Sequence, residues 1–280
     1  MRIDNFALTL HQTCPSKYNL RIRQHWTVRA RSAALGFGGA MHYGLHEWYR
    51  TDDLQMALAA IENGWPKDLP VDDYRSLSKA IETMELYVVE YPNENFKVVG
   101  MPDDPMLEVS FTLDTGLKTE GGEPIEYGGI FDGIIDYGPY VYVLEHKTTS
   151  VMGATYFHQF KPNNQITGYV WAAGLLSNRK VGGAFINAIG IYKSQATRFE
   201  RKLVTRQPED IDEWLRGVKA TCDEIEMHQR TGVWPMRTVN CTMYGLCEYH
   251  RVHSLTGDNY RKKMLEQDFV KSKWDYENRD

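Results

Sequence analysis

The sequence has no apolar stretch long enough to cross a membrane. A membrane-spanning helix needs about 18 or more consecutive apolar residues, and no run in this chain of 280 residues approaches that length. The opening residues, MRIDNFALTLHQTC, also lack the apolar centre of a secretory signal. We therefore expect a cytoplasmic protein that has no membrane partner.

Cysteine is scarce, with four in the whole chain. Because cytoplasmic cysteines rarely form disulfides, each is expected to be a buried thiol, a metal ligand or a nucleophile. Positive charge is not in excess either, since the formal net charge is -5. This total excludes a protein coated in basic surface, but it leaves room for a local positive groove.

Repeats and low-complexity segments are absent, and the composition suits one domain. Hydrophobic residues make up 42% of the chain and aromatic residues 12%, which is enough for a sizeable core. We expect a single domain over residues 1–280. It would contain a helical region at 1–100, a core at 105–230 and a C-terminal region at 231–280.

The hydrophobic periodicity changes along the chain. Apolar residues at three- and four-residue steps predict helices over 29–48, 53–63 and 72–90. From about Leu107 the period is two, in LEVSFTLD, YGGIFDGIID and YVYVLEHKTT, which indicates consecutive antiparallel strands. Further expected elements are a helix at 162–176, strands at 183–192 and 198–205, a helix at 208–229 and a charged peripheral helix with a loose end after 258.

Three charged residues of the predicted strands can form one site. Glu145 and Lys147 lie two apart, so their side chains leave the same face of the strand, while His146 points the other way. A turn at Gly138 would place the strand that carries Asp132 beside them. Two carboxylates could then hold Mg²⁺ or Mn²⁺.

Such an ion would lower the pKa of a bound water and neutralise charge on a phosphate, while the lysine positions the water or stabilises the pentavalent state. The alternative is an exposed cross-strand ion pair with no function. The apolar neighbours VYVL and GGIF favour a functional site, because polar groups in buried strands need a reason to be there.

Four motifs resemble the RecB-like branch of the PD-(D/E)xK nucleases, which includes the CRISPR-associated RecB-like exonucleases and many phage nucleases. GGAMHYGLHEWY resembles the histidine motif, with His42 in the ligand position and His46 as its rival. GGIFD resembles the Gly-x-x-Asp strand, EHKT the Glu-x-Lys-Thr strand, and QITGY the helical Gln-xxx-Tyr motif.

This resemblance implies an α/β fold with a restriction-endonuclease-like core, in which helices flank a central mixed sheet. It implies the metal ligands His42, Asp132 and Glu145. The implied catalytic residues are Asp132, Glu145, Lys147, Gln165 and Tyr169. Gln165 and Tyr169 would share one helical face and orient water or a phosphate, although a tyrosine at this spacing more often packs in a core.

The cysteines resemble the terminal metal clasp of the iron-sulfur members of this branch. HQTCPSKYNL is similar to their Cys-Pro-x-x-Tyr/Phe element, and CTMYGLCEYHRVH lies near the other end. The resemblance implies a [4Fe-4S] cluster, or a structural Zn²⁺, bound by Cys14, Cys241, Cys247 and His253. The chain lacks the usual Cys-x-x-Cys pair, and His250 could replace His253.

Unconnected thiols are the other interpretation of these cysteines. Cys222, within ATCDEIEM, is expected to be a small buried hydrophobic residue.

The implied function is a metal-dependent DNA nuclease, most simply an exonuclease that acts on single-stranded ends; phage nucleases of this kind act in the host cytoplasm. A structure-specific or end-processing endonuclease is a second enzyme class, and a non-catalytic DNA-binding or assembly subunit with the nuclease fold is a third. Intact acidic residues and lysine favour an enzyme.

The phosphate groups of DNA are expected to contact five basic residues: Lys161, Arg179, Lys180, Arg21 and Arg23. Lys262 and Lys263 are instead expected on a solvated helix face.

Overall fold

The computed structural model describes residues 1–29, 32–70, 72, 74–101, 103–243 and 245–277. The chain forms two compact units. One comprises Met1–Arg29, Thr112–Gly129 and Asp212–Asp280, and we call it the terminal unit. The other comprises Ala30–Phe111 and Ile130–Ile211, and we call it the sheet unit. Strands β6 (Leu107–Lys118) and β7 (Pro124–Tyr137) each contribute to both units.

The sheet unit is built on a mixed sheet. The second half of β7 pairs in antiparallel fashion with β8 (Tyr140–Thr149), as expected, through a two-residue loop whose Gly138 has a φ of 61°. Strand β8 then pairs in parallel with β9 (Val181–Gly190), and β9 pairs in antiparallel fashion with β10 (Arg198–Thr205). The short strand β3 (Lys97–Val98) adds to β7, and β4 (Gly100–Met101) pairs with β5 (Asp104–Pro105).

A helix makes the crossover between the parallel strands β8 and β9. The 3₁₀ turn η2 (Tyr156–Phe160) leads into α6 (Asn164–Ser177), which packs on both strands. The Asn163 side chain accepts a hydrogen bond from the Ile166 N–H and so caps the helix, which begins at Asn164. A parallel pair of strands requires such a connection.

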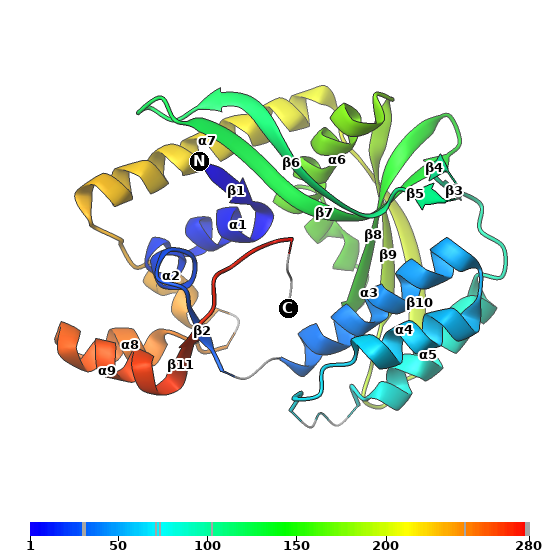
Figure 1. Cartoon of the computed structure of the whole chain (residues 1–280), viewed down its shortest axis with the longest axis horizontal. Helices are drawn as coiled ribbons and strands as arrows, with labels where there is room; N and C mark the ends of the chain where they lie inside the picture. The colour runs from blue at the N-terminus through cyan, green and yellow to red at the C-terminus, as the bar shows by residue number, and fades with distance from the viewer. Residues whose placement is uncertain (30–31, 71, 73, 102, 244, 278–280) are drawn as a thin grey trace. The chain divides into compact units, whose positions relative to one another are not determined.

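Three helices form a second layer of the sheet unit (Figure 1): α3 (Ala33–Thr51), α4 (Leu54–Gly64) and α5 (Leu77–Glu90). Their fully buried residues, such as Met41, Leu45 and Met84, pack with Ile189 at the end of β9. This apolar layer positions α3 next to β8. The predicted helices over 29–48 and 53–63 are thus present, with residues 30 and 31 lying outside the described part of the chain.

The predicted start of the third helix at Asp72 is wrong. Ser76 accepts a hydrogen bond from the Lys79 N–H at 3.2 Å and caps a helix that begins at Leu77. Asp72 instead closes a local turn by accepting bonds from the N–H groups of Tyr74 and Arg75. Residues 71 and 73 lie outside the described part.

The terminal unit combines both ends of the chain. Strand β1 (Arg2–Asp4) pairs in parallel with the first half of β7, and α1 (Asn5–Thr13), α2 (Pro15–Tyr18) and the π-helical turn η1 (Asn19–Arg23) follow. Its later part contains α7 (Pro208–Thr231), the 3₁₀ turn η3 (Thr238–Cys241), α8 (His250–Ser254) and α9 (Asp258–Asp268). Strand β2 (Trp26–Val28) pairs with β11 (Phe269–Lys271).

The predicted fold class, an α/β protein with a central mixed sheet flanked by helices, is confirmed. Among the described residues, no helix is both long and apolar enough to span a bilayer. The expected peripheral helix after 258 is α9, and the last residues of that segment, 278–280, are not described.

Candidate active site

The Glu-x-Lys pair lies in the middle of β8, with both side chains on one face. Glu145 is 1% exposed, whereas the Lys147 side chain is 30% exposed. The Lys147 ammonium donates a hydrogen bond to Glu145 Oε1 and a second one, of 3.1 Å, to Gln165 Oε1 on α6. The pair is therefore a partly buried, hydrogen-bonded group rather than the solvated cross-strand ion pair of the alternative interpretation.

Asp132 is buried on β7, and two partners fix its carboxylate. Because Gly133 pairs with Leu144, Asp132 lies at the level of the Glu145–His146 peptide. Its Oδ2 accepts a hydrogen bond of 2.7 Å from the His146 N–H, and its Oδ1 lies 3.2 Å from His42 Nδ1. Strand pairing thus brings the two predicted carboxylates to neighbouring positions, and a backbone donor orients one of them.

His42 reaches this site from α3, and a glycine explains how that helix comes close to the sheet. A Cβ on Gly38, one turn before His42, would lie 3.1 Å from Thr148 Oγ1 on β8, so a larger residue would push the helix away. The rival His46 lies one turn further along α3, with its Nε2 3.8 Å from Glu47. Of the two histidines, the structure brings His42 to the carboxylates.

Glu108 is a member of the site that the sequence analysis missed. Its Oε1 lies 3.9 Å from His42 Nδ1, and ligand atoms of His42, Glu108 and Asp132 all lie within 4.8 Å of one another. Its backbone has a φ of 48°, a left-handed conformation that is uncommon for a residue other than glycine. The only signal in the sequence was a carboxylate in the otherwise alternating strand LEVSF.

The electrostatics of the site are those of a cation site. Burial opposes a charge on His42, but the charges and hydrogen bonds of Asp132 and Glu108 outweigh it and raise the pKa of the imidazole to about 10. Burial likewise opposes a charge on Asp132, yet the His42 charge holds the pKa of this carboxyl well below its usual range. An imidazolium therefore lies between two carboxylates at neutral pH, where they would otherwise bind another cation.

Burial and the nearby lysine compete at the other carboxylate. Burial raises the pKa of Glu145 to about 7, because it outweighs the attraction of Lys147, and the charge of Asp132 acts in the same direction as burial. Glu145 Oε2 is buried and has no hydrogen-bond partner in the part of the chain that the structure describes. The ligand atoms that lie within 4.8 Å of one another are those of His42, Glu108 and Asp132, and no such group among the described residues includes Glu145. The carboxylate oxygens are hard donors of the kind that bind Mg²⁺ or Mn²⁺.

The two α6 residues differ in their surroundings. Gln165 touches the Glu-x-Lys pair directly through Lys147, whereas the Tyr169 ring packs edge-on against Phe111 and Phe131 and is 3% exposed. Burial alone would lower the pKa of Lys147, but Glu145, Asp132 and, more weakly, Tyr169 raise it. Lys147 therefore stays charged at neutral pH.

On the opposite face of β8, His146 belongs to a buried polar network. Its Nδ1 lies 2.8 Å from Asn187 Nδ2, and its ring stacks on Tyr49. Burial lowers the pKa of His146 to about 3, so the ring is neutral. The network continues from Asn187 to the Tyr87 hydroxyl, which also accepts a bond from Arg201. This side of the strand supports the peptide that orients Asp132.

The predicted clasp residues all lie in the terminal unit. Asn240, next to Cys241, donates a hydrogen bond to the carbonyl oxygen of Thr13, next to Cys14. The Cys247 N–H donates to the Cys241 carbonyl oxygen at 2.8 Å, and His253 Nε2 lies 3.2 Å from Ser16 Oγ. The chain segments that carry the four residues are therefore close together.

Among the described residues, no group with three ligand atoms within 4.8 Å of one another contains a cysteine. A single tetrahedral Zn²⁺ needs such a group. His250 Nδ1 faces Ser254 Oγ instead. The expectation for Cys222 is confirmed: its thiol is fully buried, and burial raises its pKa to about 12.

Four of the five predicted phosphate contacts have partners in the protein. Arg179 pairs with Asp136 at 2.5 Å, and the Lys180 ammonium lies 5.0 Å from the centre of the Tyr140 ring. Arg21 donates to the Ser272 carbonyl oxygen, and Arg23 lies over Trp234, both in the terminal unit. Lys161 is exposed, between η2 and α6. Lys262 and Lys263 are exposed on α9, as expected.

Comparisons with known proteins place this geometry in a family. Among solved structures, the chain is similar to a "putative exonuclease" from Eubacterium rectale, with 12% sequence identity and a TM-score of 0.52, over 92% of this chain and 89% of that one. It also matches the crystal structure of SSO0001 with 14% identity and a TM-score of 0.32, over 80% of this chain and 85% of that one.

No curated protein matches the sequence. The sequence model of the PD-(D/E)XK nuclease superfamily, in contrast, matches residues 7–252 and includes every residue of the candidate site. Because this match covers most of the chain, the protein belongs to the PD-(D/E)XK nuclease superfamily.

Proposed function

We propose that this protein is a Mg²⁺- or Mn²⁺-dependent deoxyribonuclease of the RecB-like branch, and that it acts as an exonuclease on single-stranded DNA ends. The observation that carries the proposal is the convergence of buried Asp132 and Glu145 with the charged Lys147. Members of this superfamily use divalent metals, and His42, Glu108 and Asp132 bring together ligand atoms that suit one. Glu145 Oε2, buried on the neighbouring strand, would add a further oxygen.

In this proposal, Asp132, Glu145 and His42 bind the cation, and Glu108 adds a further oxygen on the His42 side. When bound, the divalent ion supplies Lewis acidity and a water of lowered pKa. Lys147 keeps its proton at neutral pH, so we assign it to hydrogen bonding and charge neutralisation at the scissile phosphate rather than to proton abstraction.

Gln165 would hold the lysine in place through the hydrogen bond between its Oε1 and Lys147 Nζ. Its amide nitrogen is left to orient a phosphate or the attacking water. The Tyr169 ring packs at right angles against the stacked rings of Phe111 and Phe131, and this packing would fix its position beside Gln165 on α6.

The single-stranded preference and the exonuclease mode rest on the resemblance of the motifs and on the name given to the Eubacterium rectale protein. We further propose a [4Fe-4S] cluster bound by Cys14, Cys241, Cys247 and His253 because the segments that carry these residues lie together. Four free cysteines agree with a reducing, cytoplasmic location.

The alternative is a non-catalytic DNA-binding or assembly subunit. The proposal is tested by incubating the protein, with Mg²⁺, Mn²⁺ or EDTA, with linear and circular DNA in single- and double-stranded forms. Release of mononucleotides or short products from linear single strands, with circular single strands intact, is expected. Cleavage of circular DNA would show that the protein is an endonuclease and not an exonuclease.

Binding of DNA without cleavage in either metal would favour the assembly subunit. Affinity for DNA should also fall as salt rises, because lysine and arginine contacts release counterions from the phosphates. An affinity that does not change with salt would contradict a phosphate-binding groove.

A further inference from the structure

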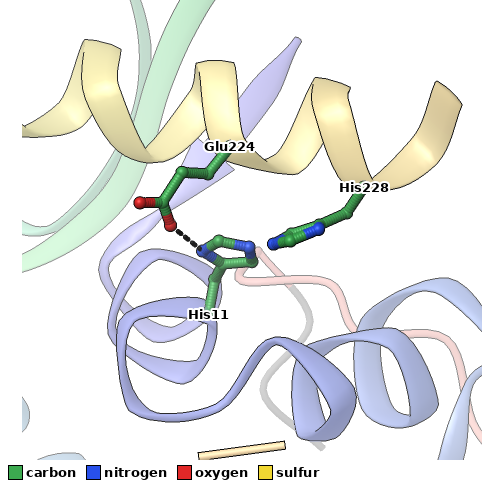
Figure 2. A group of neighbouring side chains, drawn as sticks. All are labelled: His11, Glu224 and His228. Atoms are coloured by element: carbon green, nitrogen blue, oxygen red, sulfur yellow. Dashed lines mark ion pairs between the residues drawn. The ribbon is translucent and has the colours of Figure 1, made fainter. Parts of the chain in front are cut away.

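A second cluster of ligand-type side chains lies in the terminal unit, and the nuclease chemistry does not use it. Figure 2 shows His11 on α1 facing Glu224 and His228, which project from α7. One ligand atom from each of the three residues lies within 4.8 Å of the other two, and His11 Nδ1 is 3.9 Å from Glu224 Oε2. None of these residues belongs to the predicted clasp or to the active site.

The sequence explains why two of these ligands share one face. Glu224 and His228 are four residues apart on α7, so their side chains emerge on the same side of the helix. His11 comes from the last turn of α1, and the neighbouring Gln12 fixes α1 near this part of α7 by a hydrogen bond of 3.1 Å to Thr221 Oγ1. Two helices more than two hundred residues apart in sequence thus meet at three donor groups.

The independent sign of a ligand is the state of His11. Its side chain is fully buried, and neither ring nitrogen has a hydrogen-bond partner among the residues that the structure describes. Leaving a buried polar group unsatisfied costs free energy, and its aromatic neighbours Tyr18 and Trp234 offer ring edges rather than hydrogen-bond acceptors. A buried imidazole that has no partner in the described part of the chain, beside a second imidazole and a carboxylate, is suited to bind a metal ion.

We propose that His11, Glu224 and His228 form a binding site for a divalent transition-metal ion, Zn²⁺ by preference. Two imidazole nitrogens and one carboxylate oxygen are borderline donors, which suit Zn²⁺ better than Mg²⁺. Three protein ligands leave one position for water, on the side where Glu224 is half exposed. The bound ion braces α1 against α7 and stabilises the terminal unit by binding only its folded form.

Arg237 is a cation close to this group, since its Nη2 lies 3.4 Å from Glu224 Oε2. Its Nη1 also donates to the Gln12 carbonyl oxygen. Arg237 would therefore orient the carboxylate as a neighbour of the ion. The same oxygen lies nearest His11 Nδ1, so it would bind the ion while it accepts a hydrogen bond from Arg237.

The experiment is a titration of the full chain with Zn²⁺ and with Co²⁺, in which binding at the nuclease centre is common to all the proteins compared and the difference between variants reports this site. We compare wild type with His228→Gln, with Glu224→Gln, and with Glu213→Gln, an exposed glutamate on the same helix as a matched control. Dissociation constants, Co²⁺ spectra and thermal midpoints are recorded for each.

Wild type and Glu213→Gln should bind one ion at this site, with visible cobalt bands but no thiolate charge-transfer band, and should melt higher in Zn²⁺. Glu224→Gln should bind at least about tenfold more weakly, and His228→Gln should lose the ion. Equal binding by all four proteins, or a thiolate band that accompanies the bound ion, would overturn the proposal. If His228→Gln does not fold, the affinity of the Glu224→Gln variant for the ion, altered at an exposed residue, tests the proposal.

Discussion

At the scale of single residues, the members of the active site differ in whether the sequence could predict them. Glu145 and Lys147 could be predicted as a pair from their spacing, because residues two positions apart on a strand point to the same face of the sheet. Glu108 could not, since its approach to His42 depends on a left-handed backbone position within β6. A local pattern does not record such a long-range approach.

The two histidines of α3 provide a matched test of the metal ligands. Their side chains are equally exposed, 26% each, but only His42 contacts Asp132. His42→Asn should weaken Mn²⁺ binding at least about tenfold and reduce cleavage, whereas His46→Asn should change neither. Calorimetric titration and a cleavage assay measure both effects. Equal losses in the two variants would place the ligand elsewhere.

Metal binding at this site should release protons. Burial raises the pKa of Glu145 above its usual value to about 7, and the neighbouring carboxylates raise the pKa of His42 to about 10. Both groups are therefore protonated in metal-free protein at about pH 6, and His42 alone at about pH 8.5. Since ligands bind without their protons, Mn²⁺ should release about two protons at the lower pH and about one at the higher.

Affinity for the metal should consequently fall as pH decreases, and more steeply below about pH 7. Calorimetry in two buffers of different ionisation enthalpy counts the protons. A binding enthalpy that does not depend on the buffer would show that neither group is a ligand.

At the scale of elements, the sequence predicted the core strands and the crossover helix because periodicity reports which face is buried. The alternating segments became β6, β7 and β8, and the helix that carries the Gln-xxx-Tyr motif became α6. For the first 28 residues, the sequence analysis predicted no individual helix or strand. Strand β1 is three residues long and owes its existence to pairing with β7, which no local pattern records.

One arginine anchors α6, and its loss should be measurable. Buried Arg206 donates hydrogen bonds to Thr167 Oγ1 on α6 and to the Phe160 carbonyl oxygen. Arg206→Ala should reduce the free energy of unfolding by about 1–3 kcal/mol, because buried acceptors lose their donor. It should also slow cleavage, since Gln165 begins the same helix.

Arg198→Ala is the control, because Arg198 is an exposed partner of Glu200 on β10 and a surface pair contributes less than about 1 kcal/mol. Urea denaturation and hydrogen exchange at α6 compare the two. Equal stability of the two variants would show that Arg206 does not anchor α6.

At the scale of the whole molecule, the sequence predicted one domain over residues 1–280, which stays a prediction. The structure forms two compact units, and one of them gathers the first 29 residues with the last 69. Charge and periodicity do not report which distant segments come together. The resemblance of the terminal cysteines was the only feature of the sequence that linked the two ends.

The clasp gives a prediction at this scale. Anaerobically purified protein should contain iron and sulfide and absorb broadly in the visible, and Cys14→Ala should lose both and melt at a lower temperature. Cys222→Ala should keep the iron and lose only a packing contribution of about 1 kcal/mol. Wild-type protein without iron or zinc, together with a Cys14→Ala variant that melts like wild type, would contradict the clasp.

The central claim is that buried carboxylates on β7 and β8 make this protein a metal-dependent nuclease. The most direct test is the initial rate of product release from end-labelled single-stranded DNA in Mg²⁺ by wild type, Glu145→Gln and Glu200→Gln. Glu145→Gln preserves shape but removes the charge, so its rate should fall by about 10²-fold or more, while the rate of Glu200→Gln, altered at an exposed strand position, should match wild type. Cleavage by Glu145→Gln at the wild-type rate would contradict the account.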